Sequence, residues 1–422
     1  MTVRRMATVD AQTYWMSAKI PNDQFLLYGF AGVPSELEQA LSAVRERARR
    51  CPELTLRIED GSVLTYPAWV RGGIDASQSV VHDLADNGWA GCLAAVSALA
   101  DGQLDAHVMT WRLHVFTPVD GVPGVTGAGT VAVVQATHSL GDGIRMSALA
   151  AALFGREAAV PTVQAPPPFR CAALPWRSIR AARAHRQLQR DTEAGLVPPQ
   201  ADPRPVLRTN TRPAGARSVR TVIRHRDQLP GPTVTIGVLA AVSEALSGHL
   251  RELGDDPATL GAEVPMAKTG AREAHNQFGN VGVGLYPELG FGERAERIAD
   301  DLARRRRRAA HPTMRAESRA SAAVPAPLLR WGVAQFDPEA RSPTATGNTV
   351  VSSVNRGPAD LSFGGAPVVL TAGYPGLSPM MGLTHGVHGI GDTIAISVHA
   401  AESAIVDVDA YVARLAAALR RE

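Results

Sequence analysis

Hydrophobic and polar positions along the chain follow two periods, which together predict two blocks of mixed α/β structure. Short runs rich in β-branched residues indicate strands, and apolar residues spaced three or four positions apart indicate helices. The first block is predicted to contain, in order, a helix over 35–50, strands over 54–58 and 61–70, a helix over 88–99, strands over 111–117 and 130–136, and a helix from Ile144.

The second block repeats this mixture of strands and helices. It is predicted to contain, in order, a strand over 218–226, a helix over 233–253, strands over 260–266 and 279–286, a helix over 293–308, strands over 349–355, 367–373, 382–388 and 393–400, and a helix over 407–421. The two blocks predict an α/β fold of two lobes, each with a mixed sheet, and a cleft between them.

Between the blocks the composition changes, and it predicts a long crossover instead of a domain. Prolines cluster on both sides of a basic helical segment over 176–193. We therefore divide the chain into an N-terminal lobe (1–155), a Pro-rich crossover with the basic helix (156–215) and a C-terminal lobe (216–422). The helix suits CoA phosphates or an anionic membrane surface, although such a charged face is more often only solvated. Its arginines are Arg177, Arg180, Arg183, Arg186 and Arg190.

Composition is typical of a globular enzyme and excludes several other classes. At 422 residues, 45% apolar and 20% charged, the chain is long enough for two domains and too apolar to be disordered. A net charge of +3 gives no indication of nucleic-acid binding. Cys51, Cys92 and Cys171 follow no metal-ligand spacing, so we expect reduced thiols, no bound metal and a cytoplasmic protein. The sequence shows neither a signal-peptide core nor a membrane-spanning apolar run, so any membrane contact is expected to be peripheral.

The stretch 130–154 joins a predicted strand to a predicted helix through a Gly-rich turn. His138 lies where the strand ends, on the same face as the small apolar residues at alternate positions before it. Asp142 lies where the helix begins. A histidine placed in this way has room to meet a ligand. The same residues also fit a simpler interpretation, in which Asp142 is an N-cap and His138 an ordinary strand-end histidine.

The spacing H-x-x-x-D is weak evidence by itself, because the chain contains twelve histidines. A further copy, from His388 to Asp392, lies between two strand-like runs and is interpreted as a hairpin turn. We therefore expect much less of His388 than of His138 as a catalytic candidate.

Residues 137–143, Thr-His-Ser-Leu-Gly-Asp-Gly, resemble the HHxxxDG signature of the chloramphenicol acetyltransferase-like superfamily. This superfamily includes condensation domains, plant-type BAHD acyltransferases and the bacterial wax ester synthase/diacylglycerol acyltransferases (WS/DGAT). The chain resembles the last branch in four more segments, which occur in the expected order. They are 6–11 (S-x-x-D-A), 104–105 with 111–115 (P-L-W), 278–280 with 286–287 (G-N…L-P) and 353–358 (S-N-V-P-G-P).

The resemblance implies two similar lobes with a tunnel between them, and His138 at the middle of that tunnel. It further implies acyl transfer from a thioester to an alcohol or amine, with His138 removing the acceptor's proton. The acceptor would attack the thioester directly, so no acyl-enzyme would form. The sequence offers no competing nucleophile, since it contains no G-x-S-x-G elbow and no cysteine in a motif.

The resemblance also implies that the aspartate of the signature is structural and held by an arginine. Asp142 and Gly143 would then shape the turn after the strand. Within residues 50–57, Arg57 lies on a suitable face of its predicted strand, and we expect it to be the arginine that holds Asp142.

The tetrahedral oxyanion of acyl transfer needs hydrogen-bond donors from the opposite lobe. Ser353 and Asn355 are candidates, because both project to one side of their predicted strand. In the alternative interpretation, their polar groups only satisfy a turn. Thr137, which replaces the first histidine of the signature and points away from His138 by strand parity, is a further candidate for substrate contact, as is Ser139.

Departures from the WS/DGAT pattern leave the substrates open. Thr235 and Ile236 stand where the branch has N-D, and Val354 and Arg356 change its S-N-V-P-G-P segment. We therefore expect the acceptor to be either a lipid alcohol or a specialised metabolite, and the product to be an ester or an amide. The expected co-substrate is acyl-CoA or an acyl carrier thioester, with no bound cofactor.

Two other functions stay open at this point. One is a condensation-like enzyme that acts on a carrier-bound intermediate, for which a carrier protein would have to be supplied in trans. The other is a non-catalytic protein that binds an acyl ligand, and the presence of His138 and Asp142 argues against it.

Overall fold

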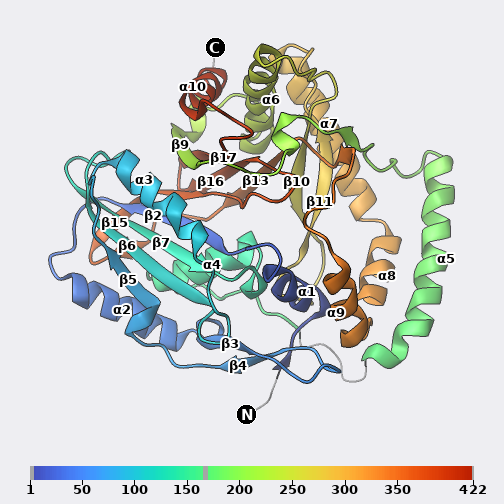
Figure 1. The fold of residues 1–422 in the computed structure, drawn as a ribbon, viewed down its shortest axis with the longest axis horizontal. Helices are drawn as coiled ribbons and strands as arrows, with labels where there is room; N and C mark the ends of the chain where they lie inside the picture. The colour runs from blue at the N-terminus through green and yellow to red at the C-terminus, as the bar shows by residue number, and fades with distance from the viewer. Residues whose placement is uncertain (1–3, 165–169, 421–422) are drawn as a thin grey trace.

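Two six-stranded mixed sheets form the centre of the protein (Figure 1). The computed structural model describes residues 4–164 and 170–420, so parts of the predicted crossover and of both chain ends lie outside the described residues. The first sheet has the strand order β14-β15-β2-β7-β6-β5. Its strands are β2 (Gln24–Phe30), β5 (Ser79–His82), β6 (Trp111–Val119), β7 (Gly129–Ala136), β14 (Ser362–Phe363) and β15 (Ala366–Gly373).

The second sheet has the strand order β11-β10-β13-β16-β17-β9, and its central strands β10, β13 and β16 run parallel. Its strands are β9 (Arg217–His225), β10 (Gly261–Ala267), β11 (Phe278–Gly284), β13 (Thr349–Asn355), β16 (Leu383–Ile390) and β17 (Thr393–Ala401). The remaining strands form two small sheets. One contains β1 (Arg4–Arg5), β3 (Leu56–Glu59) and β4 (Ala68–Arg71), and the other contains β8 (Arg204–Pro205) and β12 (Thr344–Ala345).

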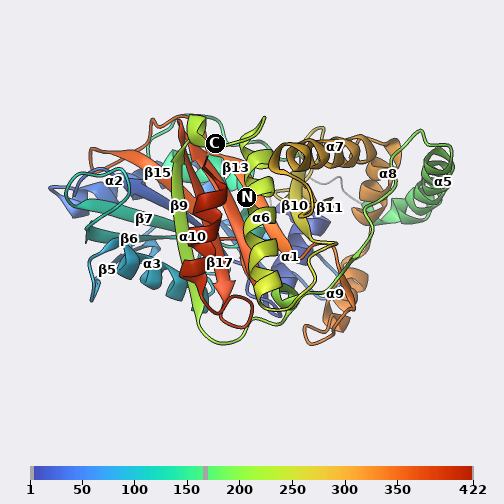
Figure 2. The same ribbon diagram turned by 90° about the horizontal axis from the view of Figure 1, so that it is seen from above.

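Helices cover the outer faces of both sheets. In the first lobe α2 and α4 pack together on one face and α3 lies on the other. In the second lobe α6, α7 and α10 cover one face, and Figure 2 shows α6 and α10 side by side. The helices are α1 (Thr8–Ser17), α2 (Leu37–Arg50), α3 (Trp89–Ala98), α4 (Gly143–Leu153), α5 (Leu174–Glu193), α6 (Val234–Glu252), α7 (Phe291–Ala309), α8 (Pro312–Ser321), α9 (Ala326–Gln335) and α10 (Val408–Ala418).

Strand β7 lies in the middle of the first sheet and leads directly to the predicted motif. All of its residues are buried, because β2 and β6 flank it and helices cover both of its faces. Its continuous run of apolar residues is typical of a strand that is covered on both sides. The alternate positions Ala132 and Val134 face the core beneath α2 and α4, whereas Val131 and Val133 face the core beneath α3.

The C-terminal half of the chain contributes two strands to the first sheet. Strand β15 pairs antiparallel with β2, and β14 continues the edge. Strand β15 also contacts β16 and β17 of the second sheet, so it connects the two sheets physically. The proposed lobes 1–155 and 216–422 therefore describe segments of sequence, while the first sheet itself contains strands from both.

The structure confirms the predicted mixed α/β architecture. Strand β13 has the predicted bounds, and α2, α3, α4, α6 and α10 lie within two residues of the prediction at their starts. Four substantial elements were not predicted: α1, β2, α8 and α9. The amphipathic pattern of α1 and α9 is weak, so periodicity did not distinguish these two helices from loops.

The basic helix of the crossover is α5, which projects from the body of the molecule and packs against α8 (Figure 1). Thr313 Oγ1 of α8 donates a hydrogen bond to the Ala184 carbonyl at 2.7 Å. Arg183, Arg186 and Arg190 are exposed. No helix among the described residues is long and apolar enough to cross a membrane.

Candidate active site

The turn after β7 places His138 and Asp142 next to the start of α4. Residues His138–Leu140 form one turn of 3-10 helix, and α4 begins at Gly143. The Asp142 carboxylate accepts the backbone N–H of Arg145 at 3.1 Å, so Asp142 is the N-cap of α4. The simpler interpretation, that Asp142 is an N-cap, is thus correct, but capping is only one of several contacts of this carboxylate.

Asp142 also forms a buried ion pair with Arg272, which lies between β10 and β11. Arg272 donates to Asp142 through Nη1 at 2.7 Å and through Nη2 at 3.3 Å. The backbone N–H of Gln277 donates to the same carboxylate at 2.9 Å. Arg272 in turn donates to the carbonyl of His275 at 2.8 Å. Asp142 therefore ties the motif turn to the segment from Arg272 to Gln277, which belongs to the other half of the chain.

Arg57 does not hold Asp142, and this expectation was wrong. Arg57 is exposed on β3, where its side chain runs past Gly72. Strand parity compared residues within one segment only, whereas the true partner lies 130 positions after Asp142 in the sequence. Glu53, four residues before Arg57, does contact the motif region: it forms an ion pair with Arg145, which is completely buried.

His138 is partly buried and is held by the side chain of Asn276. Its Nδ1 lies 3.1 Å from Asn276 Oδ1, and Asn276 Nδ2 donates to the His138 carbonyl at 2.9 Å. The ring stacks on Phe278 with 5.9 Å between ring centroids. Burial lowers the pKa of His138. Hydrogen bonds that the ring donates to its own backbone carbonyl and to Asn276, together with the charge of Asp142, offset part of this effect. The imidazole is therefore neutral at pH 7, as a general base requires.

Thr137 and Ser139 do not face open space, so their predicted contact with substrate is not supported. Both side chains are buried, and their hydroxyl groups hydrogen-bond to each other at 3.1 Å. This bond satisfies two polar groups inside the turn. Gly143 lies against the second lobe, since a Cβ built on it would be 3.0 Å from Val354 Cγ2. A larger residue at position 143 would therefore require Val354 to shift where α4 meets β13.

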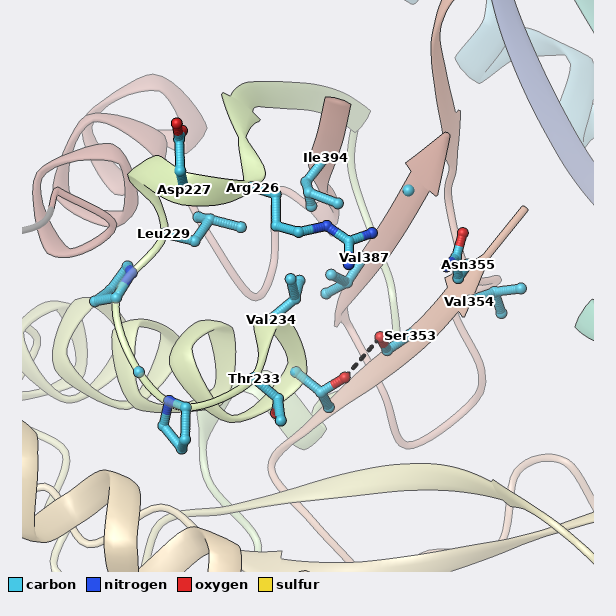
Figure 3. A pocket seen from close by; sticks show the side chains of 15 residues that line it. Arg226, Asp227, Leu229, Thr233, Val234, Ser353, Val354, Asn355, Val387 and Ile394 are labelled. Atoms are coloured by element: carbon cyan, nitrogen blue, oxygen red, sulfur yellow. Dashed lines mark hydrogen bonds between the residues drawn. The ribbon is translucent and has the colours of Figure 1, made fainter. Parts of the chain in front are cut away.

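A cavity of about 500 Å³ lies on the second lobe, between β13 and the N-terminus of α6 (Figure 3). Ser353, Val354 and Asn355 line it from β13, and Thr235 lines it from the start of α6. Val354 also lies against Gly143, so one residue that lines the cavity faces the start of α4.

Ser353 and Asn355 point into this cavity and make no hydrogen bond to His138 among the described residues. Ser353 Oγ lies 2.9 Å from Thr235 Oγ1, a contact marked in Figure 3. Asn355 Oδ1 accepts the backbone N–H of Gly357 at 2.9 Å, as the alternative interpretation of a satisfied turn expects. Their role toward an oxyanion stays a prediction.

Other copies of the H-x-x-x-D spacing have different surroundings. His388 lies inside β16 and is buried, and Asp392 lies in the hairpin between β16 and β17, as predicted for this segment. The spacing also occurs at His82 and Asp86. There His82 hydrogen-bonds to another histidine, His114, at 2.9 Å, while Asp86 accepts a backbone N–H in the turn before α3.

The sequence interpretation missed two residues that organise the site, Arg272 and Asn276. Both lie within the six residues before the segment 278–280, which was noted only for its resemblance to a WS/DGAT segment. That resemblance was the available signal, because a polar loop between two strands shows no periodicity of its own. Among residues 4–164 and 170–420, no group of three or more His, Cys, Asp or Glu side chains is arranged to hold a metal ion.

Comparison with protein families gives one match, to the WS/DGAT C-terminal domain over residues 276–421. The match begins at Asn276 and covers the last third of the chain. No curated protein matches the sequence.

Comparison with solved structures gives matches over the whole chain. The wax ester synthase/diacylglycerol acyltransferase from Marinobacter aquaeolei VT8 matches with a TM-score of 0.64 and 16% identity, over 98% of each chain. The starter condensation domain of rhizomide synthetase RzmA, as a mutant in complex with C8-CoA and Leu-SNAC, matches with a TM-score of 0.58 and 14% identity. That match covers 99% of this chain and 96% of the other. A related mutant in complex with C8-CoA has a TM-score of 0.59 and 14% identity, with coverage of 100% and 96%.

Proposed function

We propose that His138 catalyses acyl transfer in this protein. Two findings that the motifs predicted support the proposal: the chain has the two-lobed condensation fold, and residues 276–421 match the WS/DGAT C-terminal domain. The likenesses support an acyltransferase in general. The finer proposal is that the donor is a thioester, that the acceptor is an alcohol or amine, and that His138 is the general base.

The observation that carries this proposal is the hydrogen bonding of His138. Its Nδ1 is occupied by Asn276, which leaves Nε2 to accept a proton. The acceptor O–H or N–H gives its proton to Nε2 while its heavy atom attacks the thioester carbonyl. The C–S bond then breaks, and the imidazolium returns the proton to the departing thiolate. The aspartate of the motif has no place in these proton transfers, because Asp142 is fully engaged by Arg272 and backbone N–H groups.

Acyl-CoA is the first donor to test. The rhizomide condensation domain was crystallised with C8-CoA, and a fold shared over nearly the whole chain supports the same class of donor here. An acyl carrier protein acting in trans would present the same thioester. The Leu-SNAC in that structure also supports the second candidate, a condensation-like enzyme that forms an amide. A non-catalytic acyl binder is the third, and a cytoplasmic location suits all three.

The test is to incubate the purified protein with acyl-CoAs of short to long chain, separately with pooled alcohols and pooled amines. Products are then identified by mass spectrometry, with His138→Ala as the control. We expect esters or amides that form with the wild type and are nearly absent with the variant. Product formation that is equal in both would remove His138 from the chemistry. Binding of acyl-CoA without any product from any pool would favour the non-catalytic binder.

A further inference from the structure

Asp10 of α1 is a buried carboxylate whose hydrogen bonds all come from the segment that holds His138. Its side chain accepts the backbone N–H of His275 at 2.9 Å, the backbone N–H of Asn276 at 2.9 Å and Asn276 Nδ2 at 3.1 Å. Asp10 itself is 1% exposed. The contacts join residues 265 and 266 positions apart in the sequence, so they bring the N-terminal helix to the catalytic histidine through Asn276.

The hydrogen bonds of Asn276 fix which way its amide faces. Nδ2 is the donor to both Asp10 Oδ1 and the His138 carbonyl, which are acceptors only. The opposite orientation would place the amide oxygen against two other oxygens. Oδ1 therefore faces His138 Nδ1, 3.1 Å away, and a contact of this kind requires the proton on Nδ1. The lone pair is then on Nε2.

We propose that Asp10 is a positioning residue, which acts through Asn276 to hold His138 in the tautomer with a proton on Nδ1 and an unprotonated Nε2. The inference rests on the proposed role of His138 as general base. It adds a chain of three side chains, Asp10 to Asn276 to His138, that begins in the first helix and ends at the reacting nitrogen. Asp10 touches neither substrate nor the reacting atoms.

Hydrogen bonding, rather than a long-range charge, is the means by which Asp10 acts. Burial raises the pKa of Asp10 to about 6, while the donors of His275 and Asn276 and the charge of Arg145 oppose that rise. At pH 8 the group is a carboxylate, and each of its contacts has a donor on the other side. Measurements at this pH therefore test the chain of hydrogen bonds in its intact form.

The tautomer can be read directly by NMR of the full protein labelled with ¹⁵N-histidine. Long-range ¹H–¹⁵N correlations distinguish a protonated Nδ1 from a protonated Nε2, and the spectrum of His138→Gln identifies the signals of His138. We expect wild type to carry the proton on Nδ1. In Asp10→Asn the new amide opposes the donor of Asn276, so a substantial fraction of His138 should shift to the Nε2-protonated form.

Kinetics supply the second readout. A wrong histidine tautomer can cost about 10⁴-fold in kcat when a directly bonded aspartate is replaced. Because Asp10 acts through one more residue, we expect a loss of about 10–10²-fold in kcat for Asp10→Asn, with little change in KM for the donor. Asp301→Asn is the matched control, since Asp301 is also a buried acceptor of a backbone N–H but lies in the second lobe, at α7. It should leave the tautomer and kcat unchanged.

Asn276→Ala removes the side chain that connects Asp10 to His138, while the two backbone donors to Asp10 remain. This variant replaces Asp10→Asn in the test if Asp10→Asn does not fold. An unchanged tautomer in both folded variants, or a wild-type His138 with its proton on Nε2, would overturn the inference. These outcomes are separable from failure of the proposed function. The tautomer shift can be measured by NMR even if no product is ever detected. If wild type is active, His138→Ala inactive and Asp10→Asn fully active, only the positioning role of Asp10 is rejected.

Discussion

The segments around His138 and His388 share the spacing H-x-x-x-D, but the fold surrounds them in opposite ways. His138 follows the end of a buried strand and has a hydrogen-bond partner at Nδ1. His388 lies inside β16, and its Nδ1 has no hydrogen-bond partner among the described residues. Its pKa is lowered well below the usual value by burial and by the nearby charge of Arg356. Both imidazoles are neutral, yet of the two only His138 has a side-chain partner at Nδ1.

The two aspartates differ even more. The side chain of Asp142 is 7% exposed and is bound by Arg272, whereas that of Asp392 is 70% exposed in a hairpin turn. The spacing H-x-x-x-D therefore fixes a distance along the chain and nothing more. The chemistry depends on which other elements arrive at the turn. For His138 they are α1 and the segment from Arg272 to Gln277.

The largest expected difference between the two copies is in stability. Asp142→Ala leaves Arg272 as a buried cation without its partner, which typically costs about 3–5 kcal/mol. Asp392→Ala removes an exposed carboxylate whose nearest cation, Arg226, is 3.9 Å away, so the expected cost is at most about 1 kcal/mol. Urea unfolding of both variants measures the difference. A fully stable but inactive Asp142→Ala would instead give Asp142 a direct chemical role.

The second expected difference is in the pH dependence of the rate. A general base must be neutral, so kcat/KM should fall about tenfold per pH unit once the pH drops below the pKa of His138. Burial lowers this pKa, so the fall should begin below the usual value of about 6.5 for histidine. The profile of His388→Asn should follow that of wild type. If the acid limb of the profile shifts in His388→Asn, the group whose protonation controls the rate is His388 and not His138.

A smaller effect is expected beside His388, at Arg356. This side chain is 4% exposed and makes no ion pair among the described residues. Its Nη1 donates to Thr371 Oγ1 and to the Leu27 carbonyl, and its guanidinium lies 5.2 Å from the centroid of the Tyr28 ring. Burying a guanidinium without a counter-ion is costly and offsets these contacts, so Arg356→Met should change the free energy of unfolding by no more than about 1 kcal/mol, or increase it. Chemical denaturation provides the measurement. A loss comparable to that of Asp142→Ala would mean that the contacts of Arg356 outweigh the cost of burying its charge.

Much of the fold could be predicted from the sequence, because strong periodic patterns survive packing. The buried run of β7, the amphipathic α2 and the strand β13 are examples in which local pattern and final structure agree. The pairing of β15, a strand from the C-terminal half of the chain, with β2 of the first sheet could not be predicted in this way. Its pattern indicates a strand, but the choice of β2 as its neighbour depends on the packing of the whole chain.

The site was predictable only where its residues are neighbours in sequence. His138 and Asp142 lie in one turn and could be chosen together from the sequence, whereas Arg272, Asn276 and Asp10 come from distant segments. Arg57 was chosen for its strand face, and that choice failed because contact between segments depends on tertiary structure. Thr137 and Ser139 were expected near substrate, but each hydroxyl is satisfied by the other inside the turn.

The most direct measurement of the central claim is a comparison of His138→Ala with His388→Ala in one acyl-transfer assay, at a temperature where both are folded. The account predicts that His138→Ala loses about 10²–10⁴-fold in kcat/KM, the usual contribution of a general base, and keeps its unfolding midpoint. His388→Ala should keep nearly all of its activity per folded molecule. Near wild-type turnover of His138→Ala, or an acylated side chain trapped on the wild-type enzyme, would contradict the account.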